Sequence, residues 1–323
     1  MNSAKISVLG AGAFGTALAC ALSAREPITL WSRSQSHANE MRKTRMNTTR
    51  LPNIILPNNI TITSDTRLAT QSDTLLLAVP MQSLRNLIDK LQTSLVGKNL
   101  IACCKGQELS THLGPIAVIH ATVTPATAAL LTGPSFAQDI AAGLPTALTL
   151  ACQEPQDAKL LQHQIACETL RIYRTTDIVG AELGGALKNV IAIACGTVIG
   201  AGLGESARAA LMTRGFAEIV RWAKHLGAQS STLYGLSGLG DLALTCSSEQ
   251  SRNYQFGLAI GAGKVGDRKK TVEGIATALS IAEVAKSEQF DMPITTTVAA
   301  LVKSETDVAT AIHALLSRPV AYE

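Results

Sequence analysis

The feature that most constrains the fold is an alternation of two kinds of apolar segment in the first half of the chain. Short runs rich in Val, Ile, Leu and Thr are separated by longer segments with the apolar period of a helix. Strands that are apolar along their whole length need cover on both faces, and parallel strands obtain it from the helices that connect them. The alternation therefore predicts an α/β fold with a mostly parallel, doubly wound sheet.

The predicted strands are 5–10, 27–33, 59–64, 73–80, 99–106, 128–133, 146–152 and 170–175, with helices over 14–24 and 82–95 among them. After about residue 178 the β-type runs give way to long Ala-rich segments that predict helices. We therefore expect an α/β domain over 1–178 and an all-α domain over 179–323. A length of 323 residues agrees with two domains, at about 150 residues per domain.

One helix of the second half is amphipathic. Over 207–227, apolar residues gather on one side. They are Leu211, Phe216, Ile219, Val220, Ala223 and Leu226. The other side carries Arg214, Glu218, Arg221 and His225, and Gly227 is the expected C′ residue.

Composition excludes several classes of protein. Hydrophobic residues make up 46% and charged residues 16%, against about 25% in typical chains, so the chain can bury enough surface to be ordered. The uncharged stretch between Glu108 and Asp139 is interrupted by Pro115, Pro125 and Pro134, so it does not predict a membrane-spanning helix. The N-terminal sequence lacks the pattern of a signal peptide, and we expect a cytoplasmic protein without membrane insertion.

The seven cysteines contain no C-x-x-C pair, so we expect reduced, mostly buried thiols. No metal site is expected, because the six histidines show no spacing matched to those cysteines. A net charge of +4 with 3% aromatic residues argues against nucleic acid as a partner. A small anionic ligand is the more economical target.

The sequence GAGAFG at 10–15 follows a predicted strand and opens a predicted helix. In that context Gly10 permits the tight turn, Gly12 lets the backbone approach a pyrophosphate, and Gly15 lets the helix pack closely. The helix N-terminus adds amide donors for an anion. The motif predicts a Rossmann-type dinucleotide-binding domain over 1–178; the alternative is a glycine-rich turn without a ligand.

The end of the second predicted strand bears on the choice of cofactor. An acidic residue there would hydrogen-bond the ribose 2′-hydroxyl of NAD, but this chain has Ser32 and Arg33, with no Asp or Glu until Glu40. A cation favours the 2′-phosphate, so we expect NADPH and NADP to be preferred, with NADH and NAD as weaker alternatives. The alternative interpretation of Arg33 is an ordinary surface side chain.

Lys188 is the only cation between Asp177 and Arg208. Its helical neighbours at three and four positions are glycine and apolar residues, so it does not lie on a charged stripe. Burying an ammonium is costly unless it is paired or its pKa falls, and such a lysine is suited to acid/base chemistry. The alternatives are a lysine that extends to water or one that pairs with Glu182.

Further ligand-type residues flank glycine-dense loops. GLSGLGDLALTC at 235–246 carries the single acid Asp241, and an SRN triplet follows at 251–253. These features are individually ambiguous, because Asp241 could cap a helix and the triplet could be a plain loop. Lys105 and GPSFA at 133–137 follow predicted strands, where parallel sheets bind ligands. We expect these groups to converge on a cleft between the domains, which suits hydride transfer.

Together these motifs resemble those of the bacterial NAD(P)-dependent glycerol-3-phosphate dehydrogenases. The likeness runs from GAGAFGTALA through LWSR, LLAVP, GPSFA, ELGGALKNVIAIACG, GLGDL and SRN to DMPI, and so spans nearly the whole chain. It implies the reversible reduction of dihydroxyacetone phosphate to sn-glycerol 3-phosphate, which supplies glycerophospholipid synthesis. The implied partner is therefore a small phosphorylated triose or glycerol, with Lys188 as the proton-transfer residue.

Motif and resemblance together indicate two sets of site residues. The predicted cofactor contacts are Gly10, Gly12, Ala13, Phe14, Gly15, Arg33, Lys105, Ala137, Arg252, Thr271 and Glu273. The predicted substrate contacts are Lys105, Gly133, Ser135, Lys188, Asn189, Asp241, Thr245, Ser251, Arg252 and Asn253. Ala13, Gln107, Ser206 and Thr271 depart from the residues common in the family, and none of these departures removes a charged catalytic group.

Two alternatives stay open at this stage. Dehydrogenases of β-hydroxy acids and of 6-phosphogluconate share the two-domain architecture and a helix-borne lysine followed by Asn, although GLGDL and SRN weigh against them. A non-catalytic nucleotide-sensing module would have no use for a buried lysine. The Ala-rich helices late in the chain could support a homodimer.

Overall fold

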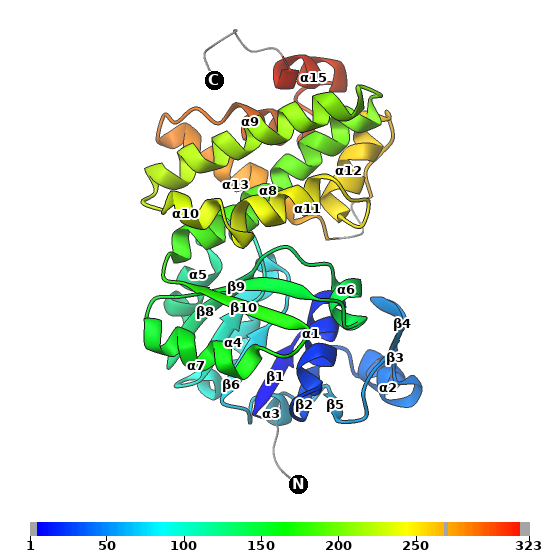
Figure 1. Cartoon of the computed structure of the whole chain (residues 1–323), viewed down its shortest axis with the longest axis vertical. Coiled ribbons are helices and arrows are strands. Elements are labelled where there is room, and N and C mark those ends of the chain that lie inside the picture. The colour runs from blue at the N-terminus through cyan, green and yellow to red at the C-terminus, as the bar shows by residue number, and fades with distance from the viewer. Residues whose placement is uncertain (1–4, 268–270, 317–323) are drawn as a thin grey trace. The chain divides into compact units, whose positions relative to one another are not determined.

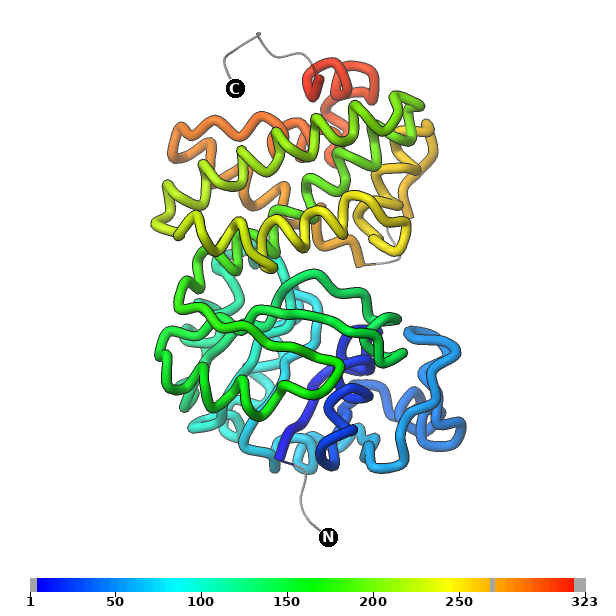
Figure 2. Tube along the Cα trace, viewed as in Figure 1, coloured from blue at the N-terminus to red at the C-terminus, as the bar shows by residue number. Residues whose placement is uncertain are grey.

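The computed structural model describes residues 5–267 and 271–316, which form two compact units. The first unit consists of the described residues up to Cys104 together with Pro115–Ile178, and the second of Lys105–Gly114 and the described residues from Val179 onward. Segment 105–114 lies within the predicted first domain but belongs to the second unit. Its residues are held by helices of that unit, as described below. Figure 2 follows the chain through both units.

The first unit contains an eight-stranded sheet with the strand order β10-β9-β8-β7-β6-β1-β2-β5. The strands are β1 (Ile6–Leu9), β2 (Ile28–Trp31), β5 (Ile60–Thr63), β6 (Thr74–Leu77), β7 (Asn99–Ala102), β8 (Thr127–Thr132), β9 (Thr146–Cys152) and β10 (Leu170–Thr175). All neighbouring pairs are parallel except β8 and β9. The predicted mostly parallel, Rossmann-type sheet is confirmed (Figure 1).

Helices connect these strands, and a short hairpin stands apart from the main sheet. The helical elements are α1 (Ala13–Ser23), α2 (Gln35–Thr44), α3 (Thr66–Ala69), η1 (Met81–Ser83), α4 (Leu84–Leu95), α5 (Pro115–Thr122), α6 (Ala137–Ala141) and α7 (Pro155–Ile165). The hairpin is β3 (Met46–Asn47) with β4 (Leu51–Ile55). Val8, Leu30 and Leu76 of the central strands are fully buried, as expected for strands covered on both faces.

The second unit is helical (Figure 1). Its elements are α8 (Ile178–Gly200), α9 (Gly204–His225), α10 (Ser230–Leu233), η2 (Leu236–Gly240), α11 (Asp241–Cys246), α12 (Arg252–Gly261), α13 (Glu273–Ser287), α14 (Pro293–Val302) and α15 (Val308–Leu316). Among the described residues, α8 is the one helix long and apolar enough to cross a membrane, and 89% of its most apolar window is buried within the fold. It is the core helix of this unit.

Glycines let α8 and α12 pack with their backbones in close approach. A Cβ on Gly196 would lie 2.2 Å from the carbonyl oxygen of Tyr254, and one on Gly257 would lie 2.1 Å from that of Ile193. Any side chain at either position would force the helices apart. The close packing brings the start of α12, with Asn253, to the polar part of α8.

Helix α9 follows the predicted amphipathic pattern with two errors. Leu226, expected on the apolar side, is the exposed C-cap residue. Glu218, expected on the polar side, is 2% exposed. Its carboxylate accepts hydrogen bonds from the Ile294 and Thr295 amides at 2.8 and 2.9 Å and from the Thr295 hydroxyl at 2.7 Å. It therefore caps the first turn of α14, a tertiary contact that helical periodicity does not reveal. Burial raises the pKa of this carboxyl.

The cysteines are all free, and five of the seven are buried. This agrees with the expectation of reduced, mostly buried thiols. At the end of α9, Gly227 has a φ of +86° and follows the C-cap residue Leu226, as predicted for a C′ glycine.

Candidate active site

A buried cluster of one carboxylate and two ammonium groups is the most unusual feature of the second unit. Asp241, at the start of α11, is fully buried. Its Oδ2 accepts from Nζ of Lys105 at 2.5 Å, and its Oδ1 accepts from Nζ of Lys188 on α8. Lys188 is 6% exposed and donates also to Oγ1 of Thr245 at 2.9 Å. The partner of Lys188 is thus Asp241, rather than the Glu182 that sequence proximity offered.

The electrostatics of this cluster favour loss of a proton from Lys188. Burial lowers its pKa to about 8, the attraction of Asp241 opposes that shift, and the positive charge of Lys105 adds to it. Two ammonium groups share the one carboxylate, so these three side chains together are positively charged when both lysines are protonated. A buried lysine with a pKa near neutrality can give and take a proton, and the excess charge attracts an anion.

Backbone packing brings Asp241 to α8. A Cβ on Gly184 would lie 2.6 Å from the carbonyl oxygen of Ser237, so only glycine lets the η2 segment approach α8 this closely. Asp241 follows η2 directly, and Thr245 lies one helical turn further on the same face of α11. The Thr245 hydroxyl donates to Asp241 Oδ1 at 3.3 Å, which links all three groups.

A chain of amide groups continues from the lysine. Asn189, next to Lys188, accepts at Oδ1 from Nδ2 of Asn253 at 2.9 Å. Oδ1 of Asn253 in turn accepts from the backbone amide of Gly274 at 2.9 Å. The two asparagines are at most 9% exposed, so these bonds satisfy polar groups that burial would otherwise leave unpaired. Gly274 was not among the predicted site residues, because a backbone donor has no signature in the side-chain sequence.

The SRN triplet forms the beginning of α12. Ser251 is the N-cap residue, and its hydroxyl accepts from the Tyr254 amide at 3.2 Å. Arg252 is exposed and lines a shallow hollow of about 190 Å³ together with Gln255, Phe256, Val265 and Val272. Thr271 is exposed, and Glu273 is the first residue of α13. The triplet therefore provides a helix cap at Ser251, an exposed cation at Arg252 and a buried amide at Asn253.

Helix α13 holds the segment that carries Lys105. The Ser280 hydroxyl, which is fully buried, donates to Oε1 of Gln107 at 3.0 Å and lies 2.8 Å from Nδ1 of His112. A Cβ on Gly106 would lie 2.8 Å from Oγ1 of Thr277, and Gly106 has a φ of +110°. Gln107, a departure from the apolar residue common in the family, is thus matched by a polar partner. Sequence reasoning missed Ser280, although the unusual Gln107 was a signal.

The glycine-rich turn of the first unit has the form that a bound dinucleotide requires. Gly10 has a φ of +126°, and a Cβ there would lie 2.3 Å from the carbonyl oxygen of Ala78. A Cβ on Gly15 would lie 2.0 Å from the carbonyl oxygen of Gly10. A Cβ on Gly12 would meet nothing within 4 Å, so Gly12 faces open space at the N-terminus of α1. Two glycines therefore serve the turn itself, and the third leaves room for a ligand.

The other predicted residues of the first unit lie at strand ends and helix starts. Ala13 and Phe14 begin α1, Arg33 is exposed just after β2, and Ala137 begins α6. Gly133 follows β8 with a φ of +133°, and the Ser135 hydroxyl donates to its carbonyl oxygen at 3.2 Å. Carboxyl ends of parallel strands are where such sheets bind ligands.

Each unit thus gathers its own share of the predicted residues. Six of them take part in side-chain hydrogen bonds with one another in the second unit, namely Lys105, Lys188, Asn189, Asp241, Thr245 and Asn253. In the first unit, Gly10, Gly12, Ala13, Phe14 and Gly15 form one continuous turn and helix start. Among the described residues, no three His, Cys, Asp or Glu side chains are grouped as a metal site.

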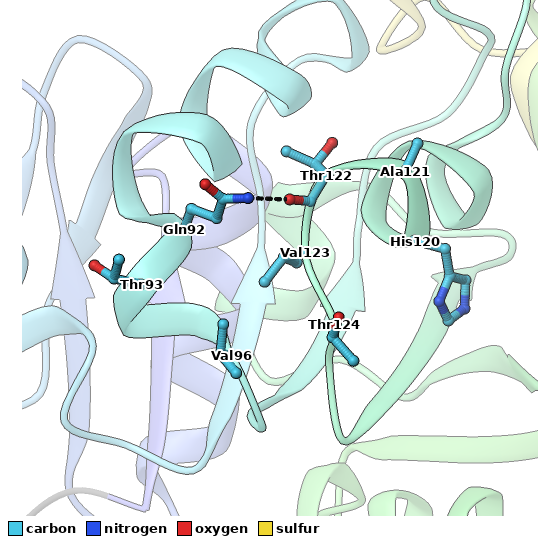
Figure 3. A pocket seen from close by; sticks show the side chains of 8 residues that line it. All are labelled: Gln92, Thr93, Val96, His120, Ala121, Thr122, Val123 and Thr124. Carbon is cyan, nitrogen blue, oxygen red and sulfur yellow. Dashed lines mark hydrogen bonds between the residues drawn. The ribbon is translucent and has the colours of Figure 1, made fainter.

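A shallow pocket of about 350 Å³ lies elsewhere in the first unit, between the ends of α4 and α5 (Figure 3). Its lining includes Gln92, Val96, His120 and Thr124, and Gln92 donates to the carbonyl oxygen of Thr122 at 2.7 Å. None of the predicted site residues lines it.

A Rossmann-type sheet with this turn, followed by a helical unit with a buried lysine–aspartate pair, is typical of nicotinamide-dinucleotide-dependent dehydrogenases. The chain belongs to the NAD-dependent glycerol-3-phosphate dehydrogenase family: residues 5–158 match the N-terminal part of that family and residues 177–313 the C-terminal part. It is an NAD(P)-dependent oxidoreductase, as its resemblance implied.

Individual relatives agree with this assignment. Glycerol-3-phosphate dehydrogenase (NAD(P)+) of Roseobacter denitrificans is 56% identical over 98% of this chain and 99% of the relative. The protein of the same name from Cereibacter sphaeroides is 54% identical over 98% of this chain and all of the relative. The crystal structure of glycerol-3-phosphate dehydrogenase from Coxiella burnetii is 34% identical, with a TM-score of 0.91 over 97% of this chain and 98% of that one. A D-mandelate dehydrogenase, 13% identical with a TM-score of 0.63, shares the fold alone.

Proposed function

We propose that this chain catalyses the reversible reduction of dihydroxyacetone phosphate to sn-glycerol 3-phosphate. The observation that carries the proposal is the buried cluster of Lys188, Asp241 and Lys105. Membership in the glycerol-3-phosphate dehydrogenase family supports the substrate, and the excess positive charge of the cluster suits a phosphorylated one. The GLGDL and SRN elements, which weighed against β-hydroxy acids, supply Asp241 and Asn253 to this cluster and its amide chain.

Lys188 is the proposed proton donor. The bound nicotinamide supplies the hydride that reduces the carbonyl carbon. Reduction leaves negative charge on the carbonyl oxygen, and the Lys188 ammonium neutralises it by transferring a proton, so that an alcohol and a neutral amine result. In the reverse direction the neutral amine accepts the proton of the alcohol. A pKa of about 8 is suited to both directions, because neither protonation state is rare near neutral pH.

The neighbours of Lys188 have separate proposed roles. Asp241 and Thr245 hold Nζ of Lys188 at a fixed place, and Lys105 adds a second positive charge that stabilises a developing alkoxide. Asn189 and Asn253 orient the substrate hydroxyls, while Arg252 and Ser251 at the start of α12 bind its phosphate or that of the cofactor. Gly133 and Ser135 of the first unit complete the proposed set of substrate contacts.

The proposed nucleotide site lies on the first unit. Gly12, Ala13 and Phe14 at the start of α1 would hold the pyrophosphate, with Gly10 and Gly15 shaping the turn. Arg33 would pair with the 2′-phosphate, which makes NADPH the preferred reductant. Ala137, Lys105, Arg252, Thr271 and Glu273 are the remaining proposed cofactor contacts. The family match supports NAD(P) as cofactor and leaves the preference to experiment.

The proposed setting is the cytoplasm, where free thiols are stable and where the product would enter glycerophospholipid synthesis. We propose no nucleic-acid or membrane partner. A homodimer through the Ala-rich helices of the second unit completes this proposal, and sedimentation of the purified chain measures it.

The test is a steady-state assay of NADPH and NADH oxidation with dihydroxyacetone phosphate, for the wild type and for Lys188→Ala. We expect turnover by the wild type, a lower KM for NADPH than for NADH, and a kcat about 10²- to 10⁴-fold lower for the variant. Lys224→Ala, which changes an exposed lysine on α9, is the control and should behave as the wild type. Near-normal turnover by a folded Lys188→Ala variant, or preferential turnover of a β-keto acid, would refute the proposal.

A further inference from the structure

A fully buried asparagine contacts the glycine-rich turn from outside the main sheet. Asn47 lies on β3, the first strand of the hairpin, and is 0% exposed. Its Nδ2 donates to the carbonyl oxygen of Ala11 at 3.0 Å and to Oγ1 of Thr16 at 2.7 Å. Ala11 lies between Gly10 and Gly12, and Thr16 belongs to the first turn of α1. Asn47 therefore donates hydrogen bonds to both the glycine-rich turn and the first turn of α1.

The bond to Ala11 has a consequence for the neighbouring amide. A peptide group is planar and trans, so its carbonyl and its N–H point in opposite directions. Because Asn47 holds the carbonyl of Ala11, it also holds the direction of the Gly12 N–H on the other side of the same peptide plane. Gly12 is the residue whose missing side chain opens onto free space. Asn47 thus orients a donor of the turn without lying in the nucleotide site.

The bonds of Asn47 also assign the tautomer of a histidine. Nδ2 of Asn47 uses both of its hydrogens, so Oδ1 must be the acceptor of its contact with Nε2 of His37 at 2.9 Å. Nε2 of His37 therefore carries a hydrogen. The other ring nitrogen, Nδ1, lies 3.3 Å from Oγ of Ser32, which is 2% exposed and directly precedes Arg33. One continuous path of side chains joins the glycine-rich turn to the end of β2.

We propose that Asn47 and His37 are positioning residues for the nucleotide. Asn47 orients the backbone of the glycine-rich turn, which meets the part of the nucleotide common to NADPH and NADH. His37 orients Ser32 and the adjoining Arg33, where the two nucleotides differ. This inference rests on the proposed function, because it assigns the 2′-phosphate to Arg33. Asn47 is fully buried, so its amide must be hydrogen-bonded, and the half-buried His37 supplies the donor to its Oδ1.

Two substitutions of His37 each remove one of its two side-chain contacts and can keep the other. A Gln side chain can place its amide nitrogen near the position of Nε2 and keep the bond to Asn47 while losing the contact with Ser32. An Asn side chain is shorter, so it can replace Nδ1 near Ser32 and leaves Asn47 without its partner. Asn47→Leu removes every bond of the asparagine, and Ser36→Ala, an exposed position on α2 outside the path, is the control.

The experiment measures dissociation constants of NADPH and NADH by isothermal titration calorimetry without substrate, and kcat at saturation. For Asn47→Leu we expect both dissociation constants to rise about tenfold with an unchanged ratio, which is the loss of one to two hydrogen bonds. His37→Asn should give a smaller rise of the same kind. For His37→Gln only NADPH binding should weaken, by about threefold. We expect kcat to stay within about twofold for all, since these residues lie outside the lysine cluster.

The proposal is wrong if the two His37 variants change affinity and nucleotide ratio in the same way, or if a folded Asn47→Leu variant binds both nucleotides as the wild type does. If Asn47→Leu fails to fold, the comparison of His37→Gln with His37→Asn tests the proposal by itself. A wild type that binds neither nucleotide refutes the proposed function instead. The wild type could bind both nucleotides and reduce dihydroxyacetone phosphate while the variants show the same dissociation constants and kcat. That outcome would refute only the positioning roles of Asn47 and His37.

Discussion

The glycine-rich turn and the lysine cluster build their sites by opposite means. At the turn, missing side chains shape the backbone, and six consecutive residues supply that backbone. At the cluster, charged side chains come from residues 105, 188 and 241, and their meeting depends on three separate elements. A site built from backbone groups can therefore be predicted from a short sequence motif. A site built from distant side chains forms only when folding brings those residues together.

The largest effect is expected where the charged site loses its shared anion. Asp241→Asn keeps the shape of the side chain but removes the carboxylate charge that Lys105 and Lys188 share. We expect kcat to fall by about 10³-fold and the free energy of unfolding to fall by about 3–5 kcal/mol, because the buried ammonium of Lys188 loses its carboxylate partner. Turnover assays and urea denaturation measure the two quantities.

The matched control is Asp73→Asn. The side chain of Asp73 is 91% exposed and pairs with Lys98 at 3.3 Å, so this substitution should change neither activity nor unfolding. If Asp241→Asn were as harmless, the cluster would owe its geometry to packing alone, and the contrast with the glycine-rich turn would disappear.

The turn offers an internal comparison between two of its glycines. Gly10→Ala should destabilise the protein by about 2–4 kcal/mol, because its φ is +126° and the new Cβ would lie 2.3 Å from a carbonyl oxygen. Gly12→Ala should leave the unfolding midpoint unchanged, since its Cβ would meet nothing within 4 Å. Its methyl group would instead occupy space needed by the pyrophosphate and weaken NADPH binding about tenfold.

Denaturation curves and NADPH titrations of both glycine variants check this prediction. An equal loss of stability at Gly10 and Gly12 would mean that both glycines serve the fold. Unchanged NADPH affinity in Gly12→Ala would mean that the nucleotide does not approach the turn.

The pH dependence should distinguish the two sites in a single protein. Reduction needs the protonated form of Lys188, so kcat for reduction should fall about tenfold per pH unit above about pH 8. Oxidation needs the neutral amine, so its kcat should fall in the same way below about pH 8. The dissociation constant of NADH should stay constant from pH 7 to 9, because backbone amides do not titrate in this range.

Lys105→Met sharpens the pH prediction. The positive charge of Lys105 lowers the pKa of Lys188, so its removal should shift the alkaline limb of the reduction profile to higher pH. A profile that stays at the same pH in this variant would show that the titrating group is not coupled to Lys105.

The smallest effect is expected at the contact that holds the Lys105 segment to α13. Ser280→Ala removes the donor to Gln107, and we expect kcat/KM to fall about threefold and the unfolding free energy by about 1 kcal/mol. Adding Gln107→Leu should restore most of the stability, because both polar partners are then gone. Ser287→Ala, exposed near the end of the same helix, serves as the control for stability and kinetics.

Failure of the double variant to recover stability would mean that Ser280 acts through His112, its other partner at 2.8 Å, rather than through Gln107. The measurement thereby tells which of the two contacts holds Lys105 in place.

Periodicity was most informative where burial is uniform along an element. The strands of the first unit lie within a few residues of their predicted ranges, and β9 coincides with its range, because a largely apolar run has one stable place in a covered sheet. Strand β10 also coincides with its range, although its residues are alternately buried and exposed. Helix α9 shows the limit of that reasoning. The helical pattern predicts Glu218 as a surface residue. Its burial is favourable because the backbone amides of Ile294 and Thr295 at the N-terminus of α14 donate hydrogen bonds to its carboxylate.

Local pattern and residues adjacent in the chain were enough to predict the Rossmann-type sheet, the glycine-rich turn and the unusual position of the Lys188 cation. Three features became visible only in the folded chain: Asp241 is the partner of Lys188, segment 105–114 belongs to the helical unit, and Asn47 contacts the glycine-rich turn and His37. The physical reason is that hydrogen bonds and ion pairs act over a few ångströms, and only close packing, such as that at Gly184, brings distant residues within that range.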